Sequence, residues 1–156
     1  MSLDGILKGH DLFRSLSVDQ AHGISDFSTV KKFDADDVIF SHNDPAGHIY
    51  MLMEGAVDLR LPSEGQDFSL VISKIEKGEL FGLSPLLDSP RYTATAQCVE
   101  ATEVLSIEAK PLRELLKRNS LVGFEIINQV AHIYFKRYIE ILKRLQGVVG
   151  QVSLIR

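Results

Sequence analysis

Two histidines and a glutamate lie close enough in the sequence to suggest a metal site. His42, His48 and Glu54 follow one another at intervals of six residues. Imidazole and carboxylate groups are common ligands of zinc and iron. Two histidines separated by one residue on a strand point to the same face and can share a metal ion, and the five histidines of the chain include no such pair. The spacing does not favour a metal enzyme.

Motifs for nucleophilic or phosphoryl-transfer catalysis are missing from the sequence. No serine stands in a G-x-S-x-G pattern, and no G-x-x-x-x-G-K loop is present. Cys98 is the single cysteine, which excludes an internal disulfide, a four-thiolate zinc site and a cysteine-ligated iron–sulfur cluster. We predict a buried Cys98 and a protein that is not an enzyme.

Length and composition indicate one globular domain over residues 1–156. The apolar fraction of 45% is ordinary, and no apolar run reaches the roughly 18 residues that would span a bilayer. The N-terminus lacks the pattern of a signal peptide. A net charge of -4 argues against general nucleic-acid binding. We expect a cytoplasmic protein with no direct nucleic-acid partner and no membrane insertion.

The hydrophobic pattern changes twice along the chain. Residues 1–26 form an N-terminal helical segment, in which Ser17 is a plausible N-cap. Residues 27–108 consist of short β-type runs separated by turn residues, as in an antiparallel sandwich or barrel. Residues 109–156 return to a helical period, with helices expected at 109–117 and 121–146.

Two strands in the middle region alternate clearly between apolar and polar residues. The alternation predicts one buried and one exposed face for each strand. The residues expected to be buried are Val57, Leu59 and Leu61 in the first strand and Phe68, Leu70 and Ile72 in the second.

The long C-terminal helix carries two apolar stripes. The first has the alternating spacing of four and three that is typical of a coiled-coil seam, and comprises Ile127, Ala131, Tyr134, Tyr138, Ile141 and Leu145. The second, expected to pack on the rest of the domain, comprises Phe124, Val130 and Ile133. The first stripe predicts a homodimer through this helix, although both stripes could instead cover one wide core face. A solvated basic face is expected from Lys136, Arg137, Lys143 and Arg144.

Two stretches resemble the domain shared by catabolite-activator regulators, regulatory subunits of protein kinase A and cyclic-nucleotide-gated channels. They are FDADDVIFSHNDPAGHIYMLMEGAVDLRL and KIEKGELFGLSPLLDSPRYTATAQCVEATEVLSI. The resemblance implies a mainly β fold, an antiparallel β-roll of the cupin-like jelly-roll type with helices before and after it. It also implies a cyclic-nucleotide ligand, cAMP or cGMP, bound at a phosphate-binding cassette.

The cassette departs from the family pattern at two positions. Residues 78–87 keep the Phe-Gly and Leu-Leu landmarks, but Leu83 stands where the resemblance implies a ribose-binding glutamate. Tyr92 stands at the position of the phosphate-binding arginine, with Arg91 one residue earlier and aimed at the opposite face of a regular strand. Ser84 is a candidate N-cap before Pro85.

The resemblance and these departures together define the expected site. The candidate ligand-binding residues are Gly82, Leu83, Ser84, Pro85, Arg91, Tyr92 and Thr93, and the candidate lid residues are Tyr134 and Tyr138. No cofactor is certain, and a cyclic nucleotide or another small anion is the possible ligand.

We expect a regulatory sensor domain in which a ligand repositions the long helix. The alternatives are a ligand-free dimerisation module, a metal-dependent cupin enzyme, and a haem sensor with His132 as axial ligand. Only ten residues follow Gln146, too few for the helix-turn-helix domain of the transcription factors.

Overall fold

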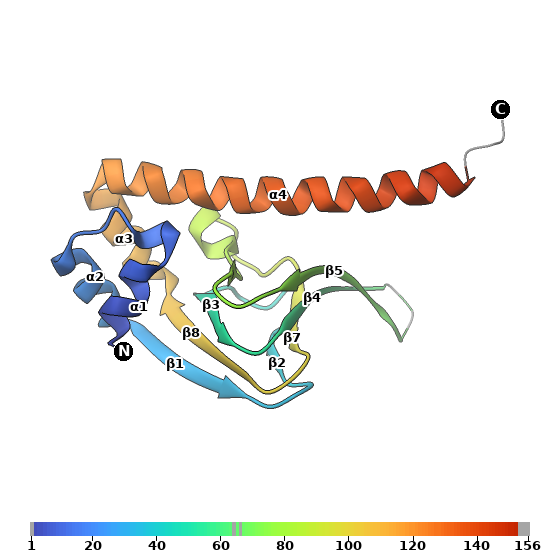
Figure 1. The fold of residues 1–156 in the computed structure, drawn as a ribbon, viewed down its shortest axis with the longest axis horizontal. Helices are drawn as coiled ribbons and strands as arrows, with labels where there is room; N and C mark the ends of the chain where they lie inside the picture. Colours follow the sequence, from blue (N-terminus) through green and yellow to red (C-terminus); the bar gives the residue numbers. More distant parts are fainter. Residues whose placement is uncertain (1, 64, 66, 153–156) are drawn as a thin grey trace.

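Helices gather at one end of the molecule, and one long helix runs from them along its full length (Figure 1). The computed structural model describes residues 2–63, 65 and 67–152. At the N-terminus helix α1 covers Leu3–Gly9, a 3-10 turn η1 covers Asp11–Phe13 and helix α2 covers Val18–Ser25.

The start of α2 is capped as its sequence predicts. The Ser17 hydroxyl accepts a hydrogen bond from the Gln20 amide at 3.1 Å, and the Gln20 side chain accepts one from the Ser17 amide at 2.9 Å. This reciprocal pair satisfies two amides that the helix itself leaves without partners. The prediction of Ser17 as N-cap is confirmed.

In the part of the chain that the structure describes, eight strands form two antiparallel four-stranded sheets. The first has the order β1-β8-β3-β6 and the second the order β2-β7-β4-β5. The strands are β1 Ser28–Phe33, β2 Val38–Phe40, β3 His48–Glu54, β4 Val57–Pro62, β5 Ser69–Ile75, β6 Leu80–Phe81, β7 Thr95–Cys98 and β8 Thr102–Glu108. The predicted fold, an antiparallel roll with flanking helices, is confirmed.

Strand β3 separates two hydrophobic cores because its side chains alternate between its faces. Ile49 and Met51 enter a core shared with the helices, which we call the helix core. Tyr50 and Leu52 enter a second core between the two sheets, which we call the roll core. Cys98 lies in the roll core and is 1% exposed, as predicted.

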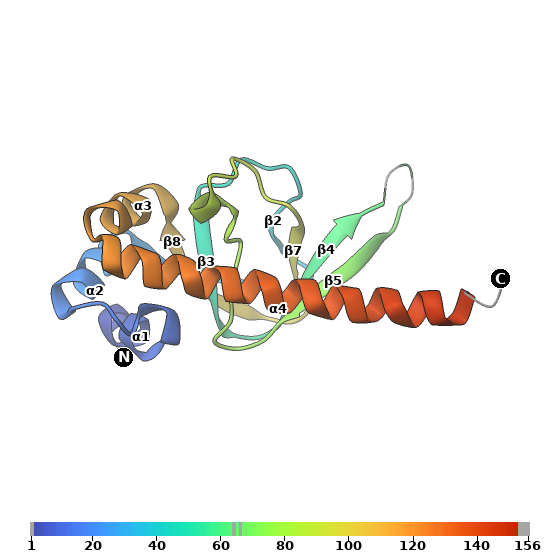
Figure 2. The ribbon, with the colours of Figure 1, turned by 90° about the horizontal axis from the view of Figure 1, so that it is seen from above.

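Two helices follow the roll. Helix α3 covers Ala109–Arg118, and helix α4 covers Ser120–Val152 with 33 residues, or about 50 Å. Viewed from above, α4 crosses the roll and continues beside the β4–β5 hairpin (Figure 2). The sequence predicted its start to within one residue but ended it at Gln146, six residues early. In the described residues no helix is long and apolar enough to cross a membrane.

The predicted buried face of the β4–β5 hairpin is only partly correct. Val57 and Leu59 are buried, but Leu61 is 41% exposed and Leu70 is 63% exposed. The pairing of the two strands shifts between Leu59 and Arg60. An irregularity of this kind changes which side chains face the core, so simple alternation fails beyond it. Phe68, also expected in the buried face, precedes β5 and is 63% exposed.

Candidate functional site

The expected cassette forms a tight turn between β6 and a short helix. Gly82 follows β6 with a φ of 66°, and Ser84–Leu87 then form the 3-10 turn η2. Leu83 is the N-cap of η2, so the expectation that Ser84 caps this turn is wrong. Ser84 and Pro85 lie inside the turn and are buried.

An aromatic stack fills the roll directly behind Gly82. The stack, which we call the inner stack, consists of Phe40, Tyr50, Phe81 and Tyr92, all at most 6% exposed. The centroids of the Phe40 and Tyr92 rings lie 3.9 Å apart with 21° between their planes. A Cβ at Gly82 would lie 3.0 Å from both Phe40 Cε2 and Tyr50 Cδ2. The cassette turn is therefore in contact with the stack.

Tyr92 is held in this stack by its hydroxyl group. The hydroxyl donates to the main-chain carbonyl of His48 at 2.7 Å and accepts from the His48 amide at 3.2 Å. Burial raises the pKa of the Tyr92 phenol, so the group stays neutral near pH 7. A neutral phenol already bonded to the main chain cannot supply the positive charge of an arginine.

The neighbours of Tyr92 point the other way. Arg91 is exposed, and its guanidinium donates to the carbonyl of Asn43 at 2.6 Å. Thr93 is exposed as well. The alternation around Tyr92 thus follows the geometry expected from the sequence, with Tyr92 inside and Arg91 outside.

Leu83 does not face the inner stack. It is 1% exposed and belongs to the helix core, together with Leu80 and Leu86, whereas Tyr92 belongs to the roll core. The two positions at which the sequence departs from the expected pattern therefore lie in different cores.

Helix α4 lies against the cassette from the helix side. Burial raises the pKa of the Tyr134 phenol, and a hydrogen bond with the Ser84 hydroxyl partly offsets this effect. Three residues further along, the guanidinium of Arg137 donates to the carbonyl of Leu80 in β6. Tyr138, the other candidate lid residue, is 56% exposed and is not part of this contact.

Two arginines of α4 lie on its docked face, contrary to expectation. Arg137 is partly buried, and burial lowers its pKa. Arg144, two helical turns later, donates to the carbonyl of Val71 in β5 at 2.9 Å. Val130, Arg137 and Arg144 follow one another at intervals of seven residues, which places them on the same face of the helix. This spacing was the signal in the sequence that could have placed both arginines on the docked face.

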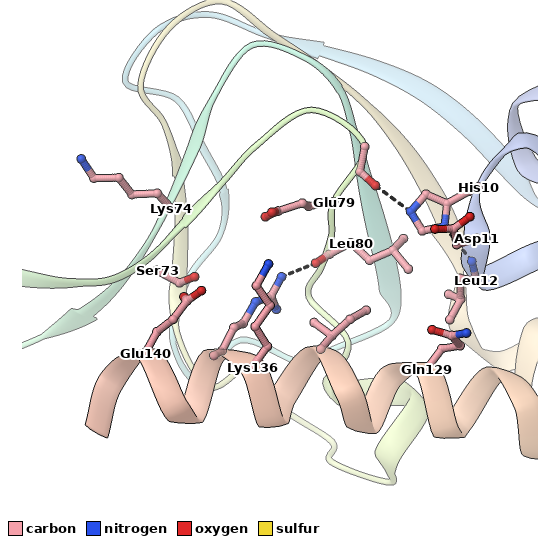
Figure 3. A pocket seen from close by; sticks show the side chains of 13 residues that line it. His10, Asp11, Leu12, Ser73, Lys74, Glu79, Leu80, Gln129, Lys136 and Glu140 are labelled. Atoms are coloured by element: carbon pink, nitrogen blue, oxygen red, sulfur yellow. Dashed lines mark hydrogen bonds between the residues drawn. The ribbon is translucent and has the colours of Figure 1, made fainter. Parts of the chain in front are cut away.

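A groove of about 250 Å³ opens between α4, the 3-10 turn η1 and the turn before β6 (Figure 3). His10 Nε2 lies 2.6 Å from the carbonyl oxygen of Gly78 at one end. Arg137 bonds to the carbonyl of Leu80 in the middle of the groove, and Ser73, Lys74 and Glu140 line the other end (Figure 3). The charged residues of its lining are balanced in sign: Lys74, Lys136 and Arg137 against Asp11, Glu79 and Glu140. The groove thus has no evident preference for an anion.

The predicted site residues separate into two groups. Gly82, Leu83, Ser84 and Pro85 share one turn, with Tyr92 and Tyr134 on either side of it. Arg91, Thr93 and Tyr138 lie outside this arrangement.

Comparison with known proteins identifies the fold of this site. Residues 30–119 match the family model of the cyclic nucleotide-binding domain. The chain belongs to the cyclic-nucleotide-binding domain family. This match covers more than half of the chain, including the roll, the cassette turn and α3.

Regulators are prominent among the relatives of this cyclic-nucleotide-binding domain. The chain is 28% identical over 114 residues to the anaerobic regulatory protein of Bacillus subtilis, covering 72% of this chain and 47% of the relative. It is 29% identical over 121 residues to the cyclic AMP receptor protein of Thermus thermophilus, covering 77% and 55%. The chain thus spans about half the length of these relatives.

A solved regulator shares the fold. The structure of DNR from Pseudomonas aeruginosa superposes with a TM-score of 0.72 at 26% identity, covering 89% of this chain and 61% of that one. DNR is a transcriptional regulator.

The histidines and acidic residues were also candidate ligands of a metal ion or a haem. Within the described part of the chain, no group of three histidine, cysteine, aspartate or glutamate side chains could hold a metal ion. His132 is exposed on α4.

Proposed function

We propose that this cyclic-nucleotide-binding domain is a non-enzymatic effector domain that acts as a homodimer paired through α4. The observation that carries the proposal is the position of α4 between two surfaces. On one face of the helix Tyr134 packs against the helix core, which includes Leu83 and Leu86 of the cassette turn, and Arg137 donates to the carbonyl of Leu80. Its opposite face exposes Phe124, Phe135 and Tyr138. A conformational change in the roll would therefore move α4 and, with it, the surface that binds the second copy.

The exposed face is comparable in area to the largest apolar patch of a typical monomer, and such patches are often functional. Phe124, Phe135 and Tyr138 are 71%, 61% and 56% exposed. With roughly 200 Å² for each aromatic side chain, they contribute about 380 Å² per chain. Leu145 and Val149 extend the same face. Contiguous apolar patches beyond a few hundred Å² mark interaction surfaces, and a stable interface buries about 800 Å² on each partner.

The proposed seam differs in part from the one expected from the sequence. Ile127 and Tyr134, predicted for the dimer seam, pack against the helix core. Phe124, predicted to pack on the domain, is exposed. Val130 and Ile133 do pack on the domain, as expected. The proposed seam therefore lies about 50° around the helix axis from the predicted seam, which is half of the 100° between successive residues of a helix.

Sedimentation velocity tests the dimer. We expect twice the mass of one chain for the wild type and a monomer for Phe135→Glu, because a carboxylate cannot be buried in an apolar interface without a partner. Phe68→Glu is the matched control, since Phe68 is 63% exposed but lies on the hairpin. A monomeric wild type, or dissociation by the control alone, contradicts the proposal.

We also propose that the domain does not hold cAMP or cGMP by the contacts that the resemblance implies. The Thermus relative is named a cyclic AMP receptor, but here Tyr92 is stacked on Phe40 at the arginine position. Without the arginine and glutamate contacts, affinity falls by about a thousandfold or more.

Isothermal titration calorimetry with each nucleotide tests this second part. We expect no heat at millimolar concentration. Micromolar binding would show that the inner stack moves aside for a ligand, and this part of the proposal would fail.

A further inference from the structure

One polar residue interrupts the exposed stripe of α4. The stripe consists of eight residues at alternating spacings of four and three, which we call the outer seam: Phe124, Asn128, Ala131, Phe135, Tyr138, Leu142, Leu145 and Val149. In a heptad abcdefg these spacings place Asn128, Phe135, Leu142 and Val149 at a positions and the others at d positions. Seven of the eight are apolar.

We infer that Asn128 sets the orientation of the two helices in the dimer, so that they run parallel and in register. This inference rests on the proposed dimer and names the residue that specifies its arrangement. Asn128 is exposed in the single chain. In a parallel pair it faces Asn128 of the second copy across the two-fold axis. An amide side chain is both donor and acceptor, so the two can bond to each other.

The position of Asn128 within the outer seam excludes an equally good antiparallel pair. An antiparallel pair that covers the whole seam places Phe124 opposite Val149, and Asn128 opposite Leu145. Two amides per dimer would then be buried against leucine without a partner. An antiparallel pair centred on Asn128 would satisfy both amides but leave Tyr138, Leu142, Leu145 and Val149 uncovered. Parallel pairing alone buries the apolar seam and satisfies the amides.

Single-cysteine crosslinking tests the orientation. Ala131→Cys meets its own copy in a parallel pair, whereas it meets Leu142→Cys of the second copy in an antiparallel pair. The native Cys98 is 1% exposed and stays out of the reaction. We mix the two cysteine variants, each with a different tag, oxidise them, and measure crosslinks between identical and between different chains.

The same assay on Asn128→Leu tests the role of the asparagine. With Asn128, we expect crosslinks between identical positions almost exclusively. Asn128→Leu removes the amide that favours the parallel over the antiparallel pair, so crosslinks between positions 131 and 142 should rise at least about tenfold. The dimer should also melt at a higher temperature, because leucine replaces a polar residue in the seam. Gln129→Leu is the matched control, because it replaces the same kind of amide one residue away from the seam; we expect no change in pattern.

Each outcome separates this inference from the proposed dimer. If the wild type is a monomer by sedimentation, the proposed dimer fails and the inference fails with it. A dimer that already crosslinks between positions 131 and 142, or one whose pattern is the same for Asn128→Leu, overturns the inference while the dimer stands.

Discussion

The Tyr92 hydroxyl closes a two-way hydrogen bond with the main chain of His48, donating to its carbonyl at 2.7 Å and accepting from its amide at 3.2 Å. Residues 48 and 92 lie 44 positions apart in the sequence, so this pair joins the start of β3 to the segment that precedes β7. The same tyrosine ring stacks on Phe40. Tyr92 therefore fills the roll and ties two of its segments together.

Tyr92→Phe should destabilise the domain without changing its shape. The ring remains, but the His48 amide and carbonyl lose their partner, at a cost of about 1 to 3 kcal/mol in the free energy of unfolding. Urea denaturation measures the loss. Tyr138→Phe, at a tyrosine that is 56% exposed, should change the free energy by less than about 0.5 kcal/mol. Equal effects of the two substitutions would show that the His48 bonds contribute nothing.

Gly82→Ala should be costly for two reasons. Its φ of 66° disfavours a residue with a Cβ, and that Cβ would lie 3.0 Å from both Phe40 and Tyr50. We expect a loss of about 2 to 4 kcal/mol in thermal or chemical denaturation. Gly47→Ala is the control, because a Cβ there has no atom within 4 Å. A neutral Gly82→Ala would mean that the inner stack is loosely packed.

Arg137→Ala should loosen α4 from the cassette. It removes the bond from the guanidinium to the Leu80 carbonyl, and a hydrogen bond to a charged group contributes about 1.5 to 3 kcal/mol. We expect a lower melting temperature and faster amide exchange around residue 137. The control is Lys143→Ala, at an exposed lysine of the same helix. If both variants behave alike, the Arg137 contact does not hold the helix in place.

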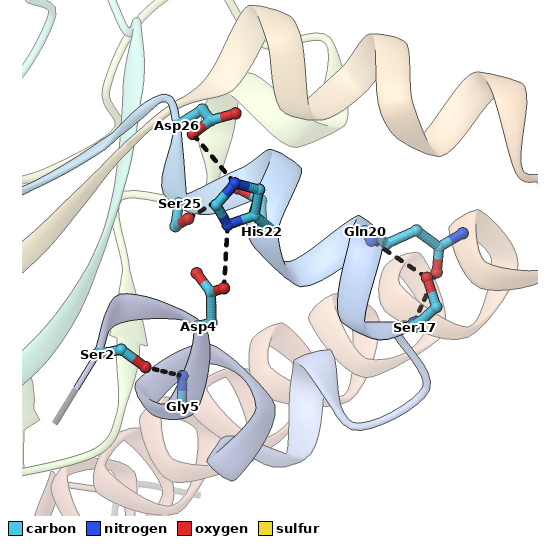
Figure 4. Close-up of polar contacts among 8 residues, drawn as sticks. All are labelled: Ser2, Asp4, Gly5, Ser17, Gln20, His22, Ser25 and Asp26. Carbon is cyan, nitrogen blue, oxygen red and sulfur yellow. Dashed lines mark hydrogen bonds and ion pairs between the residues drawn. The ribbon is translucent and has the colours of Figure 1, made fainter.

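A histidine between two aspartates links α1 to α2 (Figure 4). His22 Nδ1 lies 3.1 Å from Asp4 Oδ2, and His22 Nε2 lies 4.0 Å from Asp26 Oδ1. The hydrogen bond to Asp4 and the charges of both carboxylates raise the pKa of His22 above 6.5. Charged His22 therefore stabilises the folded protein. This contribution is complete below pH 6.5, the pKa of an unperturbed histidine, and is lost as the pH rises through the higher pKa of His22 in the folded protein.

The melting temperature should therefore fall slightly as the pH rises above about 6.5, because His22 then loses its charge in the folded protein. His22→Gln removes the titrating group and should flatten this part of the curve. The effect is small, because the His22 side chain is 67% exposed and solvent screens the ion pair. An unchanged slope in His22→Gln would show that other groups cause the pH dependence.

Local periodicity was enough to predict an antiparallel β region, its flanking helices and the Ser17 cap, because each depends on neighbouring residues. The roll itself was predicted from the family resemblance. The inner stack was not predictable in this way. Phe40, Tyr50 and Phe81 come from three different strands, and only the sheet order brings them to Tyr92. Alternation along one strand carries no information about such long-range neighbours.

The face of α4 that meets the domain was harder to predict. Tyr134 and Phe135 are adjacent aromatic residues in overlapping stripes with the same heptad spacing. The structure buries part of Tyr134 against the domain and leaves Phe135 61% exposed. The choice depends on the shape of the cassette turn, which the helix sequence does not contain.

Hydrogen exchange of the wild type and Phe135→Glu tests most directly whether α4 joins the cassette to the interface. If the helix couples the two, breaking the dimer should speed amide exchange in α4 and also in residues 80–87. This segment contains Leu80, which bonds to Arg137, and shares the helix core with Tyr134. Phe68→Glu should leave both segments unchanged. Faster exchange confined to α4, with residues 80–87 as protected as in the wild type, would contradict the account.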